Sequence, residues 1–336
     1  MNNFYVIALV SFFISLGLSS LFVPAIAILS EKIGWIDLPG GLKRHKNPIP
    51  YGGGIAIIIG MLSAFFLSNL SGQNYSEGIA IIIASLLIAV AGGIDDWKPM
   101  RILSKFLIQT LAAIILVSMN LHLNIKYLSP SINIALSLLW IVGITNAVNI
   151  IDIMDGLCGG ICGVASLTLG IIGLMTGDIT LAVLCISLAG SITGFLFFNL
   201  HPAKIFMGDA GAQFIGFVLA AATIKGAYTT FNNIAIFAPI LILGIPIYDT
   251  ILVSFFRIKK GKSPFHGSPD HIALRMVKLG FSVQNTVRVL VAISFLLSVS
   301  AAAATMLEFI PAVILYSIVF FAAVIGAIYI AKVKVE

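Results

Sequence analysis

The chain has 336 residues, of which 60% are hydrophobic and only 10% are charged, and its mean hydropathy is +1.11. This composition excludes a soluble globular domain and a disordered chain, and it is typical of a protein with several membrane spans. The net charge of +6 comes from residues between the apolar runs. We therefore attribute it to membrane topology and expect no nucleic-acid partner.

Eleven apolar segments are candidate membrane helices in chain order. They cover residues 4–29, 54–70, 79–94, 102–119, 132–149, 161–176, 179–198, 212–224, 232–256, 285–305 and 309–331. The eighth is short and contains glycine, so ten spans are the alternative. The sequence thus predicts an all-α polytopic membrane protein, with residues 1–336 forming a single integral membrane domain.

Lysines and arginines gather on one side of these spans. They lie in the C-terminal tail and in five loops, 30–53, 95–105, 149–160, 199–211 and 257–284. Arg288 lies at the mouth of the tenth span on the same side, and only Lys126 and Lys225 lie opposite. The positive-inside rule makes the basic side cytoplasmic, which puts the N-terminus outside, the C-terminus inside and the protein in the cytoplasmic membrane.

Acidic residues gather on the same side, although the topology rule does not require it. All of them except Glu77, Asp178 and Glu308 lie in those loops or at helix mouths. Ionisable residues where an apolar helix meets a loop are functional candidates.

Two adjacent carboxylates, Asp95 and Asp96, end the third span in "GGIDDWKPM". Like charges at a half-buried position repel, so a divalent cation or a shared proton would explain the pair. The alternative is a solvated helix end beside Lys98 and Arg101.

The fifth span ends in "NAVNIIDIMDGLCGG", residues 146–160. Residues three apart are neighbours on a helix, so Asn149, Asp152 and Asp155 would form a ladder. Asn146 would face away from Asp155, which favours a helix-packing role for it. The glycines that follow indicate that the helix ends here. The alternative is polar residues exposed to lipid headgroups.

Three further loops carry polar groups of the same kinds. Segment 197–217 places Asp209 between glycines, where a backbone can approach a phosphate closely. Segment 259–282 is basic and contains His271, and segment 41–54 combines a cluster around Lys46 with a Gly-rich helix entry. Surface loops, and attraction of Lys and Arg to lipid headgroups, are the alternatives.

Acids, amides and bases at one membrane face together predict metal-assisted chemistry on a phosphorylated substrate. Mg²⁺ prefers oxygen ligands and commonly takes one or two carboxylates together with substrate phosphates. Basic loops would hold the remaining phosphate charge. One reactant could be soluble and the other a lipid.

Five motifs resemble those of the polyprenyl-phosphate N-acetylhexosamine-1-phosphate transferases, the MraY/WecA family. They are "KRHKNPIPYGGG", "GGIDDW", "NAVNIIDIMDGL", "NLHPAKIFMGDAG" and "SPFHGSPDHIALRMVKLGFS", in order across residues 43–282. The resemblance implies that a UDP-N-acetylaminosugar, with UDP-N-acetylglucosamine favoured, donates its sugar-1-phosphate to a polyprenyl phosphate and releases UMP. This would be the first membrane step of cell-envelope glycan synthesis.

The resemblance also implies roles for individual residues. Mg²⁺, or Mn²⁺ instead, would bind Asp209 with Asp152, and the attacking lipid phosphate would lie near the catalytic pair Asp95 and Asp96. The remaining positions would bind substrate: Asn149, Asp152, Asp155, Asn199, Phe206, Lys46 and His271. Phe206 would stack on uracil. A homodimer is suggested by the family alone.

The last motif departs from the family pattern. "DHIALRM" keeps His271 but has Ala273 and Leu274 where further histidines are common. This disfavours the muramoyl-pentapeptide branch and favours the WecA-like one. A second departure is Ile153, where many relatives have Gly.

Two other functions are alternatives to this one. A UbiA-type prenyltransferase would carry acids at four-residue spacing in two similar motifs, whereas the spacing here is three. A transporter of an anionic substrate would have acids near mid-membrane and internal repeats, and the sequence has neither.

Overall fold

The computed structural model describes residues 2–39, 47–69, 75–226, 228, 233–264 and 268–333. The chain packs as two compact units, Met1–Gly226 and Ala227–Glu336, and each is described by itself. That 1–336 form one domain stays a prediction.

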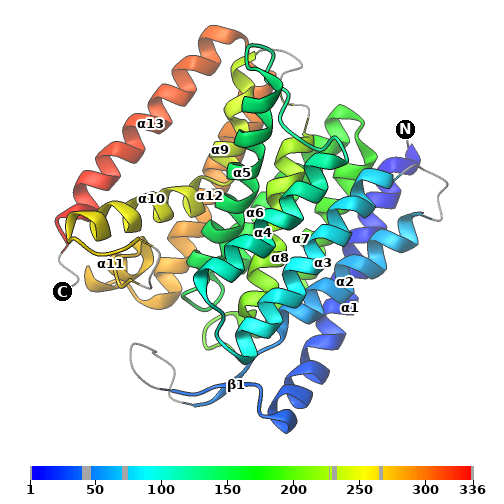
Figure 1. Ribbon diagram of the computed structural model, residues 1–336, viewed down its shortest axis with the longest axis vertical. Helices are drawn as coiled ribbons and strands as arrows, with labels where there is room; N and C mark the ends of the chain where they lie inside the picture. The colour runs from blue at the N-terminus through cyan, green and yellow to red at the C-terminus, as the bar shows by residue number, and fades with distance from the viewer. Residues whose placement is uncertain are drawn as a thin grey trace. The chain divides into compact units, whose positions relative to one another are not determined.

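The first unit consists of eight α-helices and one short hairpin among its described residues (Figure 1). Its elements are α1 (Asn2–Ile33), β1 (Ile36–Asp37), β2 (Ile49–Pro50), α2 (Gly53–Asn69), α3 (Ser76–Trp97), α4 (Ile102–Ser118), α5 (Pro130–Ile151), α6 (Leu157–Thr176), α7 (Ile179–Asn199) and α8 (Gly208–Lys225). The antiparallel hairpin pairs Ile36 with Pro50 and Asp37 with Ile49, and it is the one described departure from an all-α fold.

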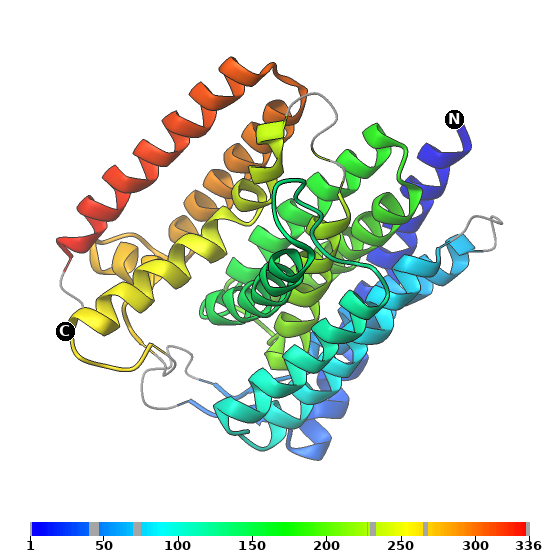
Figure 2. The same cartoon turned by 45° about the horizontal axis from the view of Figure 1, so that its top comes forward.

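All the secondary-structure elements in the described residues of the second unit are helices. Its elements are the 3-10 helix η1 (Asn233–Phe237), α9 (Ala238–Ile242), α10 (Gly244–Lys259), α11 (Ile272–Lys278), α12 (Val283–Met306) and α13 (Phe309–Ala331). The helices α12 and α13 lie side by side (Figure 2).

Helices lie in all eleven predicted segments of the described chain, which confirms an all-α polytopic membrane protein. Among the described residues, seven helices are long and apolar enough to cross a membrane by themselves: α1, α3, α5, α6, α7, α12 and α13. The apolar stretches of α2 and α4 are shorter. The exact number of spans and their orientation stay predictions.

The prediction of one continuous helix over 232–256 is wrong. The chain breaks after Ile242, and the helix that starts at Gly244 is bent by 72° from the preceding one. Pro246 lacks the N–H that would continue the helix hydrogen bonds, and its ring clashes with the carbonyl four residues earlier, so it favours a kink or break at this point. The bent pair would count as an eighth span if it crosses the membrane as one.

The core of the first unit forms around α7 and α8, most of whose residues are buried. Helix α7 packs against α1, α2 and α6, and α8 packs against α3 and α5. The start of α2 approaches the start of α8 so closely that a Cβ on Gly54 would lie 2.3 Å from the Cα of Gly211. Only glycine allows this contact, and it brings α2 next to the loop that precedes α8.

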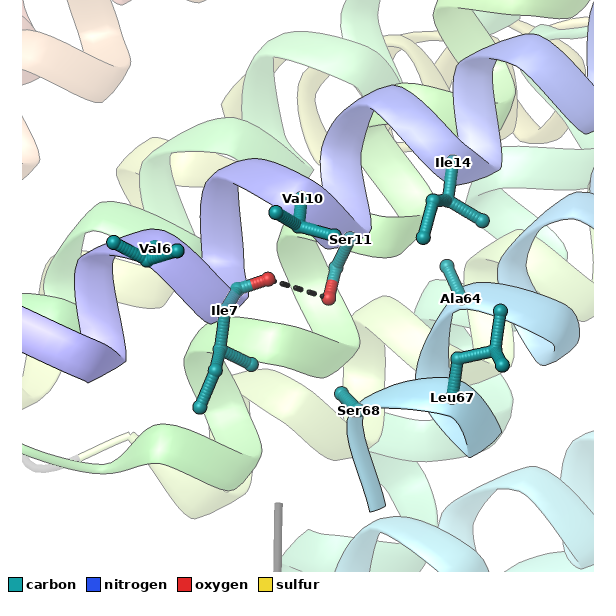
Figure 3. A pocket seen from close by; sticks show the side chains of 8 residues that line it. All are labelled: Val6, Ile7, Val10, Ser11, Ile14, Ala64, Leu67 and Ser68. Carbon is teal, nitrogen blue, oxygen red and sulfur yellow. Dashed lines mark hydrogen bonds between the residues drawn. The ribbon is translucent and has the colours of Figure 1, made fainter. Parts of the chain in front are cut away.

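An apolar groove lies between the start of α1 and the end of α2 (Figure 3). Val10, Ile14 and Leu67 contribute to its lining, and the hydroxyl of Ser11 donates back to the carbonyl of Ile7 at 2.8 Å. The eight lining side chains include no titratable group.

Charged side chains of the first unit lie at the two ends of its helices, and the residues at each end are those that the sequence predicts to share a side. Lys225 at the end of α8 pairs with Glu77 at the start of α3 and with Asp178, which caps α7. Asp96 and Asp209 lie at the other ends of α3 and α8. The second of these ends holds the candidate site.

Candidate active site at the ends of α3, α5 and α8

Asp96 holds the start of α8. Its Oδ1 accepts a hydrogen bond from the backbone N–H of Asp209 at 2.7 Å, and its Oδ2 accepts one from that of Ala210 at 3.1 Å. A carboxylate at this position satisfies two free N–H groups of a helix N-terminus and interacts favourably with the helix dipole. The contact requires Gly208, which has φ +75° and on which a Cβ would lie 2.5 Å from Asp96 Oδ2.

Lys105 joins Asp95 to Asp209. Its ammonium group, on the first turn of α4, forms an ion pair with Asp95 and another with Asp209 at 3.0 Å. Asp95 also accepts a hydrogen bond from the backbone N–H of Met100 at 2.6 Å, which closes the turn between α3 and α4. Two carboxylates from distant segments thus share one cation.

Asn149 and Asp152 approach the same group from α5. The Asn149 amide donates to Oδ2 of Asp209 at 3.4 Å. Helix α5 ends at Ile151, so Asp152 is its C-cap rather than a step of a continuing helical ladder. Burial raises the pKa of Asp152 to about 7, and the nearby charges of Asp209 and Asp96 add to this effect. The end of α5 predicted from the glycines is confirmed.

Asp155 lies in the linker between α5 and α6 and binds the loop that precedes α8. Its Oδ2 is 2.6 Å from Nδ1 of His201 and accepts the N–H of Ala203 at 3.1 Å. Asn199 connects the same two segments, because its Oδ1 accepts the N–H of Gly156 at 2.9 Å and its Nδ2 donates to the carbonyl of Ile205 at 2.9 Å. Both polar groups of this buried amide are therefore occupied by backbone.

Phe206 is held by the hairpin. Its N–H donates to the carbonyl of Pro50 at 2.9 Å, and its carbonyl accepts the N–H of Gly53 at 2.9 Å. Its ring is half-buried and lies 6.2 Å from that of Tyr51, whose hydroxyl donates to Asp37 at 2.8 Å. The base of the first basic loop is thus fixed against the segment that leads to Asp209. Lys46 lies outside the described residues.

His271 belongs to the second unit. It precedes α11, and its Nδ1 lies 2.7 Å from Oδ2 of the buried Asp249. The other oxygen of Asp249 accepts the N–H of Ile272 at 2.7 Å. Asp249 therefore fixes both the imidazole and the start of the helix.

Arg275 anchors the rest of this segment. Its guanidinium donates to Oδ1 of Asp270 at 2.6 Å and to the carbonyl of Ile330 at 3.2 Å, and it stacks on the ring of Phe256 at 3.9 Å. Burial raises the pKa of Asp270, but hydrogen bonds from Lys260 and Ser268 outweigh this effect and hold the pKa below its usual range. Asp270 is therefore a structural anion.

The structure brings most of the predicted residues of the first unit together at one end of its helices: Asp95, Asp96, Asn149, Asp152, Asp155, Asn199, Phe206 and Asp209. Sequence reasoning missed Lys105, Gln109 and Gln213. A signal for them exists, because Lys105 and Gln109 are four apart, as are Asp209 and Gln213, and such pairs share a helix face.

The donor set fits Mg²⁺ bound together with a phosphorylated substrate. Among the described residues, no group of three or more Asp, Glu, His or Cys side chains is arranged to hold a metal ion. Mg²⁺ needs only one or two carboxylates when substrate phosphates and water supply the other ligands. Asp209 beside Asp95 meets that requirement, and an ammonium group already lies between them.

Comparison with known proteins extends this description. Residues 78–227 match the model for glycosyl transferase family 4, which covers α3 to α8 and hence most of the site. The chain is 35% identical over 302 residues to a probable undecaprenyl-phosphate N-acetylglucosaminyl 1-phosphate transferase of Bacillus subtilis, over 87% of this chain and 83% of the relative.

Two further relatives carry related names. A decaprenyl-phosphate N-acetylglucosaminephosphotransferase of Mycobacterium leprae is 32% identical over 78% of this chain and 75% of its own length. An undecaprenyl-phosphate alpha-N-acetylglucosaminyl 1-phosphate transferase of Yersinia pestis is 29% identical over 83% of this chain and 80% of its own length. The similarity thus extends over most of the chain.

Proposed function

The chain belongs to glycosyl transferase family 4 and is a phosphoglycosyltransferase of a membrane, and from this we propose that it moves N-acetylglucosamine-1-phosphate from UDP-N-acetylglucosamine to a polyprenyl phosphate. The products are a polyprenyl-diphospho-N-acetylglucosamine and UMP. The names of the relatives support the sugar and the lipid class. The basic loops favour an active site at the cytoplasmic face of the cytoplasmic membrane. A homodimer stays an expectation from the family.

The observation that carries the proposal is the pairing of Lys105 with Asp95 and Asp209. Lys105 is a quarter exposed, so its ammonium group can turn from the carboxylates to an incoming diphosphate. Such a cation offsets the charge that develops on the phosphates during transfer. A prenyltransferase or a transporter would use the same cluster differently, and neither is supported by the relatives' names.

The proposed reaction is a direct displacement. An oxygen of the lipid phosphate attacks the sugar-bearing phosphorus, the bond from this phosphorus to the bridging oxygen breaks, and UMP leaves with that oxygen. When bound, Mg²⁺ would neutralise phosphate charge beside Asp209. Asp95 holds Lys105 and can accept the remaining proton of the lipid phosphate. The chain's main contribution is positioning and charge stabilisation.

The nucleotide-sugar would bind on the side of Asp209 that faces away from Asp95. Phe206 is the candidate for stacking on uracil, because the hairpin fixes its backbone and its ring stays partly exposed. Asn149 and Asp152 would contact the sugar or ribose, and the substrate-binding roles of Lys46 and His271 stay expectations from the family. Asp155 would act at the nucleotide side while also holding the loop before α8.

Two predicted roles become less direct. Asn199 uses both polar groups on backbone partners, so we assign it the shaping of the site rather than substrate contact. Asp96 uses both oxygens on the start of α8, so we assign it the positioning of Asp209 rather than chemistry.

The test is UMP release by the purified protein in detergent. We expect UMP only when UDP-N-acetylglucosamine, undecaprenyl phosphate and Mg²⁺ are all present, and much less from Asp209→Asn. Glu308→Gln is the matched control, because Glu308 is an exposed acid whose side chain caps no helix. Absence of UMP across a panel of UDP-sugars would refute the proposal.

A further inference from the structure

Three amide side chains from three helices form a connected chain behind Asp209. Gln109 on α4 and Gln213 on α8 are 2% and 3% exposed, and Asn146 on α5 is largely buried. Water is scarce inside a membrane bundle, so buried amides need partners within the protein. The Asn146 amide donates to Oε1 of Gln109 at 2.6 Å, Gln109 donates to Oε1 of Gln213 at 3.0 Å, and Gln213 donates to Oδ2 of Asp209 at 3.2 Å.

The two ends of this chain fix its direction. At one end Asn146 donates to the carbonyl of Val142 at 2.8 Å, and at the other end the Asp209 carboxylate receives Gln213. A carbonyl and a carboxylate are acceptors only, so the NH₂ group of each amide must face them. Gln109 then has one orientation that satisfies both neighbours, and its NH₂ also reaches Oδ1 of Asn146 at 3.4 Å. Each amide therefore donates one hydrogen bond to the next acceptor on the way to Asp209.

Gln213 differs from the other donors to Asp209. Lys105 is a long, quarter-exposed side chain, and Asn149 reaches the same oxygen at 3.4 Å. Gln213 is packed inside the bundle and cannot turn away without breaking its bond to Gln109. It therefore fixes the rotation of the Asp209 carboxylate even when Lys105 moves.

We propose that Gln109, Asn146 and Gln213 form a positioning relay that holds the Asp209 carboxylate ready for a metal-bound diphosphate. The proposal rests on the proposed function only in naming what Asp209 receives. Residues that orient a metal ligand from behind commonly change metal affinity or activity by 10–100-fold when replaced. None of the three contacts substrate or metal in this scheme, so they are positioning residues.

The test compares Gln213→Met, Gln109→Met and their double variant with Thr223→Val. Thr223 accepts a hydrogen bond from Trp140 at 2.9 Å, which also joins α5 to α8 but is not connected to Asp209. The Mg²⁺ concentration for half-maximal activity is measured first. A second readout is the melting temperature as Mn²⁺ is titrated onto the protein with UDP-N-acetylglucosamine and without lipid acceptor.

We expect Gln213→Met to raise the metal concentration needed in both readouts by roughly 10-fold or more, and Gln109→Met to raise it less. The double variant should match Gln213→Met, because Gln109 acts through Gln213. Thr223→Val should leave the metal requirement unchanged. Equal metal requirements in all four variants, or additive effects in the double variant, would overturn the relay.

Asn146→Leu is a second way to test the relay if a glutamine variant does not fold. It should raise the metal requirement in the same direction by a smaller factor, and an unchanged requirement would count against the relay. Failure of the proposed function looks different: the unaltered protein would release no UMP. The melting titration needs no turnover, so it still decides whether the relay controls metal binding.

Discussion

Asp96→Asn tests the pair of hydrogen bonds by which Asp96 holds the start of α8, which we call the clamp. The asparagine keeps one acceptor oxygen in place of two, so either the N–H of Asp209 or that of Ala210 loses its partner and faces an NH₂ group. An unpaired buried donor costs about 1–3 kcal/mol. Loss of the negative charge at a helix N-terminus adds about 0.3–1 kcal/mol. We therefore expect about 1.3–4 kcal/mol of destabilisation in all.

The assay is thermal unfolding in detergent together with turnover. At roughly 2–4 °C per kcal/mol for a unit of this size, the melting temperature should fall by about 3–16 °C. Activity should fall with it, because the start of α8 carries Asp209. Asp95→Asn is the comparison: it keeps an acceptor for Met100 and should lose activity with a smaller change in melting temperature. An unchanged melting temperature in Asp96→Asn would refute the clamp.

Substitutions at Lys105, Tyr51 and Gly208 also test the site. Lys105→Met should lower kcat by about 100-fold or more, because the phosphates lose their cation, and Lys105→Arg should retain more of the rate. Tyr51→Phe removes one hydrogen bond worth about 1 kcal/mol and should raise KM for the UDP-sugar roughly fivefold with little change in kcat; an unchanged KM would separate the hairpin from nucleotide binding. Gly208→Ala should abolish folding or activity, since its Cβ would collide with the carboxylate of Asp96. Gly143→Ala is the control and should be tolerated, because the space around Gly143 is open. An active Gly208→Ala variant would contradict this geometry.

Hydropathy was sufficient to locate the helices because long apolar runs are needed to cross a membrane. It did not reveal the break between α9 and α10, since the average over 20 residues hides single breakers. Gly244 and Pro246 carried that information locally. The short hairpin at Ile36 and Pro50 has no such signal, because two-residue strands depend on the loop they pack against.

The site was predictable as a set of residues and less so as a set of contacts. Asn149 and the end of α5 followed from helix geometry. The clamp joins Asp96 to the backbone of residues more than a hundred positions later, and no local spacing predicts such a pair. The role of Lys105 was not predicted because the positive-inside rule already explained a basic residue in its loop. Its ion pairs to Asp95 and Asp209 require the packed bundle.

The central claim is that sugar and phosphate move together to the lipid. The direct measurement uses UDP-N-acetylglucosamine labelled with ³²P at the sugar-bearing phosphorus, incubated with the protein, undecaprenyl phosphate and Mg²⁺. The account predicts that the label appears in the lipid fraction while unlabelled UMP is released. Label that remains in the nucleotide while sugar reaches the lipid, or no labelled lipid at all, would contradict it.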